Sequence, residues 1–206
     1  MGLMAKEGGG KQFDPVSEGV HAAVCYSIFD LGTQHDEKFD KDQHKVLLIW
    51  ELPGERIEIE KDGATQDLPR VISRKYTLSL GDKANLRKDL ETWRGRSFTK
   101  EEKEGFDLKN VLAKSCQLQV IHKTVEGKTY ANISAIIPMP KGSKPLVPEN
   151  PVRFYSIADD RDQIPEGTPK WIVDQIKESD EWKYLVSGGD RTEEPPPPLV
   201  DDEIPF

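Results

Sequence analysis

The sequence has no long apolar run and few cysteines, and these absences exclude several classes of protein. Its apolar runs, such as VLLIW at 46–50, are far shorter than the roughly 20 residues that a membrane-spanning helix needs. The N-terminal residues MGLMAKEGGGKQF lack the apolar core of a signal peptide, so a cytoplasmic address is expected. Cys25 and Cys116 each lie in a strand-like run and are expected to be reduced and buried.

Patterns that bind metals or carry out catalysis are missing as well. The GGGK stretch at 8–11 lacks the Ser or Thr that follows in a phosphate-binding loop, and the acids of 36–42 lack the Gly and the final Glu of a calcium loop. No CxxC pair is present, and the histidines have no zinc-site spacing. We therefore expect no catalytic residues, no metal, no cofactor and no enzymatic activity. The histidines are His21, His35, His44 and His122.

The net charge of −8 is distributed unevenly along the chain. Residues 1–140 hold 21 Lys and Arg against 22 Asp and Glu, whereas residues 141–206 hold 8 against 15. From 190 to 206 there are six acids, one arginine and four consecutive prolines, with no helix or strand period. Such a segment cannot bury enough apolar surface to offset the entropy of ordering, so we expect a disordered acidic tail with a polyproline spacer.

The rest of the chain is predicted to be rich in β-strands. Runs of β-branched and aromatic residues, partly alternating with polar ones, indicate five strands. Pro53-Gly54 is expected to stop the second strand, and Val125-Glu126-Gly127 to join the last two as a hairpin. The predicted strands are 19–34, 44–52, 70–80, 115–124 and 128–138.

Between the third and fourth strands the apolar period changes to that of a helix. Residues 82–95 are predicted to form a helix with Asp82 as its N-cap and Gly95 at its end. TKEE at 99–102 is a capping-box sequence, and 106–112 can form another turn. A last helix is expected at 168–182, with Thr168 as N-cap and Pro169 at the first position; the sequence leaves open whether it docks on the body or bridges neighbouring molecules.

The order of elements predicts a mainly β protein. Three strands, a helical connection and a closing hairpin are typical of a five-stranded Greek-key barrel of the OB type, here with an enlarged helical insertion between strands three and four. A long first strand fits, because it must bend to serve both halves of the barrel. The expected organisation is a flexible leader (1–16), an OB domain (17–140), a Pro-rich extension with a short helix (141–186) and the acidic tail (187–206).

The last six residues carry a specific signal. They are Asp201, Asp202, Glu203, Ile204, Pro205 and Phe206. This ending closely resembles the acidic tip of bacterial single-stranded DNA-binding proteins, although the helical segment 82–112 is larger than in that family and 150–186 is additional. The body is similar to the single-stranded DNA-binding proteins of tailed bacteriophages. The segments that carry this similarity are DLGTQ (30–34), LETWRGRSF (90–98), FDLKNVLAKSC (106–116) and KTYANISAI (128–136).

The resemblance implies a surface for single-stranded DNA and a tip for partner proteins. Single strands bind to positive grooves with aromatic faces for base stacking, and in an OB barrel these lie across strands two and three and in the flanking loops. Trp50 and Tyr76 could equally be core residues, and the cations of 83–96 a solvated face. The DNA-binding candidates are Phe39, Lys41, Lys45, Trp50, Arg70, Arg74, Lys75, Tyr76, Lys123, Lys128 and Tyr130.

Two functions are therefore expected. In the first, the protein coats single-stranded DNA without sequence preference during phage replication or recombination, in the host cytoplasm, and recruits replication or recombination proteins through its tip. Self-association is possible and membrane binding is not expected. In the second, it is an OB-fold interaction or scaffold module that docks on the replication machinery and binds little DNA itself.

Overall fold

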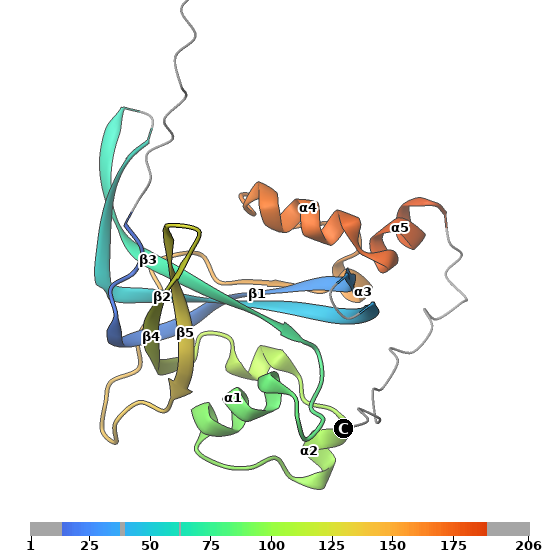
Figure 1. Cartoon of the computed structure of the whole chain (residues 1–206), viewed down its shortest axis with the longest axis horizontal. Coiled ribbons are helices and arrows are strands. Elements are labelled where there is room, and N and C mark those ends of the chain that lie inside the picture. The colour runs from blue at the N-terminus through green and yellow to red at the C-terminus, as the bar shows by residue number, and fades with distance from the viewer. Residues whose placement is uncertain (1–13, 38–39, 62, 189–206) are drawn as a thin grey trace, which may run out of the picture.

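The computed structural model describes residues 14–37, 40–61 and 63–188 and shows a mainly β protein with a curled antiparallel sheet and several helices (Figure 1). The order of the five main strands is β3-β2-β1-β4-β5, and a short sixth strand pairs with β1 in parallel. No helix in this part of the chain is long and apolar enough to cross a membrane. The strands are β1 (Gly19–Asp36), β2 (Lys41–Lys61), β3 (Ala64–Thr77), β4 (Ser115–Val125), β5 (Lys128–Ile137) and β6 (Arg153–Tyr155).

Strand β1 connects the two halves of the sheet. Its first residues pair with β4 and the remainder pairs with β2, with Val24 paired on both sides. The pairing with β2 shifts register between Cys25 and Ser27 and again between Asp30 and Gly32, and such bulges bend a strand. The expected long, bent first strand is confirmed. The strand continues to Asp36, two residues beyond the predicted end, and Gly32 adopts a positive φ within it.

Strands β2 and β3 are longer than predicted. The expectation that Pro53-Gly54 stops the second strand is wrong, since the pairing only shifts register between Leu52 and Arg56 and then runs on to Lys61 and Ala64. The extra residues form a hairpin arm that projects from the body (Figure 1). Arg56 holds the base of this arm through ion pairs with Asp67, at 2.9 Å, and with Glu149, at 2.6 Å.

The chain between β3 and β4 is helical, as the sequence predicts. Helix α1 begins at Asn85 and has no side-chain N-cap, because Ala84 and not Asp82 occupies the N-cap position; the Asp82 carboxylate pairs with Arg87. Gly95 ends α1 in the left-handed conformation, and Thr99 and Glu102 form the predicted capping box. The three elements are α1 (Asn85–Arg94), α2 (Lys100–Glu104) and η1 (Leu108–Val111).

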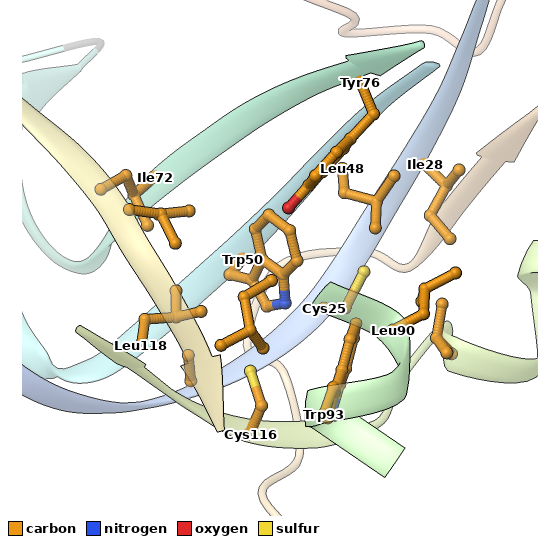
Figure 2. Packing of buried hydrophobic residues seen from close by; sticks show 14 of the residues in the cluster. Cys25, Ile28, Leu48, Trp50, Ile72, Tyr76, Leu90, Trp93, Cys116 and Leu118 are labelled. Carbon is orange, nitrogen blue, oxygen red and sulfur yellow. The ribbon is translucent and has the colours of Figure 1, made fainter. Parts of the chain in front are cut away.

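The main core lies between the inner face of the curled sheet and α1. Trp50 of β2 and Trp93 of α1 pack with their ring centroids 5.9 Å apart (Figure 2). Cys25 and Cys116 are free thiols buried in the same cluster, as expected, and burial raises the pKa of both.

The C-terminal extension packs on the opposite face of β1 and β2, which answers the question of docking that the sequence left open. Tyr155, Ile172 and Ile176 are buried with Phe29 and Leu47 in a second core cluster. The predicted helix 168–182 is two helices, divided at Ser179, whose hydroxyl caps the second one. The elements of the extension after β6 are α3 (Ile157–Asp160), α4 (Lys170–Glu178) and α5 (Asp180–Val186).

Polar contacts join α5 to β1 at Gly32. A Cβ atom on Gly32 would lie 2.5 Å from Ser179 Cβ, so only glycine permits this approach. Next to it, Thr33 donates from its backbone N–H and its hydroxyl to Glu181, both at 2.6 Å. His44 lies between Asp30, at 2.6 Å, and Glu181, at 3.5 Å. The extension is therefore part of the fold.

Candidate nucleic-acid interface

A polar groove of about 620 Å³ lies where β3 ends and the chain turns toward α1, and we call it the strand-end groove. Four of the predicted DNA-binding residues line it together: Lys45, Arg74, Lys75 and Tyr76. The remaining lining comes from Gln43, Thr77, Ser79, Gly81, Asp82, Lys83, Ala84 and Asn85. Because its one acid, Asp82, already pairs with Arg87, the groove presents an excess of positive charge to solvent.

The two lysines from neighbouring strands affect each other in this groove. Burial lowers the pKa of Lys45, and the positive charge of Lys75 lowers it further, although Asp36 acts in the opposite direction. Lys75 is exposed in part, and its partial burial lowers its pKa as well, against the influence of Glu178. A bound anion would stabilise both ammonium groups, so the site is suited to a phosphate.

A second group of predicted residues lies on the β4–β5 hairpin. Lys123 is the direct cross-strand partner of Tyr130, and Val125 is the partner of Lys128. With Ile121, these side chains lie on one face because alternate residues of a strand point to the same side. All five are exposed, and Tyr130 is 51% accessible. We call this surface the hairpin face; it combines two cations with an aromatic ring available for stacking.

Arg74 links the two groups. Its guanidinium donates to the Ile133 carbonyl of β5 at 3.2 Å and pairs with Asp89 of α1 at 2.9 Å, while it stacks on the Tyr76 ring. Strands β3 and β5, the two ends of the sheet order, therefore lie side by side at this point. Tyr130 precedes Ile133 by three residues, or about 10 Å along the strand.

Several predicted contacts are corrected by burial. Trp50 is 0% exposed and Tyr76 only 3%, so both are core residues and neither ring offers a face to a base (Figure 2). The Tyr76 hydroxyl donates to Asp89 at 2.8 Å, and burial together with that carboxylate raises its pKa. Arg70 is half-buried and donates to the Asp14 carbonyl. Arg70 and Arg74 thus have structural partners that DNA would have to displace.

Other predicted residues lie outside these two surfaces. Lys41 is exposed at the start of β2, opposite Asp36. Phe39 and the tip from Asp201 to Phe206 fall outside the described residues.

The sequence interpretation missed some lining residues of the strand-end groove. For Lys83 the sequence leaves DNA contact and a solvated helix face both open, and the chain before α1 brings it to the groove. Gln43 and Thr77 carry no charge, so the sequence pattern gave no reason to predict them. Both contact Lys45, and Thr77 Oγ1 lies 3.0 Å from the Lys45 Nζ. The only available signal was their position beside predicted cationic residues on adjoining strands.

In the part of the chain that the structure describes, no three His, Cys, Asp or Glu side chains gather as a metal site requires. No protein-family model matches the sequence, and no curated protein matches it.

Proposed function

We propose that the protein binds single-stranded DNA without sequence preference and recruits replication or recombination proteins through its C-terminal tip. It acts in the manner of the single-stranded DNA-binding proteins of tailed phages, in the host cytoplasm. Its sheet is the OB barrel in which β3 and β5 complete the closure. The observation that carries the proposal is the strand-end groove, which Lys45, Lys75 and Lys83 line together. The groove lies beside the contact between β3 and β5, and β5 leads from there toward the exposed Tyr130.

The chemistry of the two surfaces supports this ligand. Spaced lysines with lowered pKa values suit a chain of phosphates, since each phosphate relieves repulsion between them. Tyr130 beside Lys123 suits an unpaired base, because every base has a stacking face.

The test is a titration of labelled oligo-dT with full chain at two salt concentrations. Changing Lys123 and Lys128 together to Ala should weaken binding on the order of tenfold at low salt and reduce the slope of log affinity against log salt by about 1.4, at about 0.7 per lost phosphate contact. Tyr130→Ala should lose about 1–3 kcal/mol of binding free energy, whereas Tyr130→Phe should retain most of it.

A matched control is available on α2. Lys100 and Lys103 are exposed, and their replacement by Ala changes the net charge equally, far from the hairpin face (Figure 1). If that pair weakens binding as much as the hairpin pair, the effect is one of total charge and the proposed surface is wrong. If the unaltered chain binds oligo-dT weakly and without a salt slope, the scaffold function is the correct one.

A further inference from the structure

Helix α5 is attached to the body differently from α4. Helix α4 buries Ile172 and Ile176 in the second core cluster, whereas none of the seven described residues of α5 is buried and Trp182 packs only partly against that cluster. A helix this short is not stable by itself in water, where even 12 to 15 residues give roughly marginal stability. The contacts between α5 and the sheet therefore decide whether α5 forms.

The side chain of Glu181 makes three contacts with the sheet. Its Oε2 accepts a hydrogen bond from the backbone N–H of Thr33, and its Oε1 accepts one from the Thr33 hydroxyl, both at 2.6 Å. Its Oε1 also lies 3.5 Å from the Nδ1 of His44. A single carboxylate thus joins α5 to the end of β1 and the start of β2.

The His44 ring lies between two carboxylates. Its Nε2 is 2.6 Å from Asp30, and its Nδ1 faces Glu181. A neutral imidazole has one N–H and presents a lone pair at its other nitrogen, so only the protonated ring can donate to both acids. Burial lowers the pKa of His44, but the hydrogen bond with Asp30 and the charges of both carboxylates together raise it above its ordinary value.

Of the two acids, Glu181 depends more on the proton of His44. Asp30 belongs to the sheet and also accepts the backbone N–H groups of Gly32, at 2.8 Å, and Ile157, at 3.2 Å. Glu181 belongs to a helix that no buried side chain holds in place. When the ring is neutral, the two carboxylates face each other across it without a positive charge, and α5 is the element that can move away.

The other acids of the surrounding elements have partners of their own. On α5, Asp180 pairs with Lys183 at 3.6 Å, and both are exposed. Asp160 of α3 accepts a backbone N–H at 2.9 Å, and Glu178 at the end of α4 acts on Lys75. The charges that act on His44 are those of the two carboxylates on either side of its ring.

We propose that α5 is a latch that the proton on His44 closes: when the ring loses this proton, α5 leaves β1 while α4 stays docked. The latch is closed below the ordinary pKa of histidine, about 6.5, and loosens as the pH rises through the raised value. The chain that extends from the body then begins after Ser179 instead of after Val186. These seven residues add up to about 24 Å of reach to the segment that carries the acidic tip.

Hydrogen exchange of the full chain at pH 6.0 and pH 8.5, followed by NMR, tests the latch. The Thr33 N–H is bonded to Glu181 and the Lys183 N–H to the Ser179 carbonyl, so both report the opening of α5. Relative to the intrinsic rate at each pH, both should exchange at least threefold faster at pH 8.5, whereas the Ile176 N–H of α4 should keep a constant ratio. Constant ratios at Thr33 and Lys183 overturn the proposal, and so does an equal rise at Ile176.

Two variants on α5 assign the effect to its cause. Glu181→Gln removes the charge that faces His44 but keeps an oxygen that can accept from Thr33, so the ratio at Lys183 should become equal at the two pH values. Asp180→Asn removes an exposed acid from the same helix and should keep the full pH difference. A pH difference that survives Glu181→Gln, or that Asp180→Asn abolishes, overturns the proposal. The comparison in the unaltered chain requires neither variant to fold, and the assay contains no DNA or partner protein.

Discussion

At the scale of single residues, burial separates groups that look equivalent in the sequence. Trp50, Tyr76 and Tyr130 are all strand aromatics near positive charge, yet only Tyr130 is exposed. Arg74 and Lys75 are adjacent, but alternate residues of a strand point to opposite sides. The Arg74 side chain therefore lies at the contact between β3 and β5, whereas Lys75 is exposed. A variant that changes both would therefore combine a structural defect with a binding defect, and Lys75 should be tested alone.

A prediction at this scale concerns His44. Burial lowers its pKa, but the hydrogen bond with Asp30 and the charges of Asp30 and Glu181 outweigh burial and raise the pKa above its ordinary value. A raised pKa in the folded state means that protonation stabilises the fold. The stabilisation is complete below the ordinary pKa, about 6.5, and is lost as the pH rises through the raised value.

Unfolding by denaturant from pH 5 to pH 9 measures this effect. His44→Gln should cost on the order of 1 kcal/mol at pH 5.5, as expected for a charge-assisted hydrogen bond, and progressively less as the pH increases. His122→Gln is the matched control for histidine loss, because the His122 ring hydrogen-bonds the Val16 carbonyl and, among the described residues, no carboxylate. A difference between His44→Gln and the unaltered chain that is constant with pH would contradict the assigned role.

At the scale of elements, the extension and the insertion cover opposite faces of the sheet. Helix α1 closes the inner core through Leu86, Leu90 and Trp93, and α4 covers the outer side of β1 and β2 through Ile172 and Ile176. The strand-end groove lies at the end of β3, where Asn85, the first residue of α1, contributes to its lining. The extension thus limits how much of the sheet can contact a ligand.

We expect α4 to contribute substantially to stability. Ile176→Ala should lower the free energy of unfolding by about 2–5 kcal/mol, because it opens a cavity in a fully buried cluster. Trp171→Ala, on the same helix but at a side chain 46% exposed, should cost less than about 1 kcal/mol. Chemical denaturation of both variants gives the comparison, and similar small losses would show that α4 does not stabilise the body.

At the scale of the whole molecule, negative charge is concentrated in the C-terminal third of the chain. Residues 141–206 hold 15 acids against 8 basic residues, whereas the preceding 140 residues are almost neutral. The acids of the tip repel the phosphates of DNA, and this repulsion weakens as salt is added. Electrostatic interactions decay over about 8 Å at physiological ionic strength and about 30 Å at 0.01 M.

We expect that deleting 201–206 leaves the midpoint of thermal unfolding unchanged. The deletion should raise the affinity for oligo-dT several-fold at 0.01 M salt and hardly at all at 0.15 M, because screening already hides the acids. Phe206→Ala in the full chain keeps the side-chain charges and serves as the control. A large gain at 0.15 M would indicate that the tip occupies the DNA surface itself.

Much of the fold could be predicted from the sequence because its signals are local. Strand alternation, the hairpin at Val125-Glu126-Gly127, the capping box at Thr99 and the left-handed Gly95 each depend on a few neighbouring residues. The acidic tip is likewise a feature of the sequence alone, and its role stays a prediction. A local signal gave a wrong prediction at Pro53-Gly54. These residues were expected to end the second strand, but the strand continues past them with only a shift in register.

Only the tertiary structure decided which face of each strand is covered. Alternation places Lys45 and Leu47 on one side of β2 and Trp50 on the other, but it cannot say that α1 buries one side and α4 the other. The strand-end groove, the role of Arg74 at the seam and the contact of Gly32 with Ser179 join residues far apart in the chain. Such contacts depend on how the sheet curls, which no short stretch of sequence specifies.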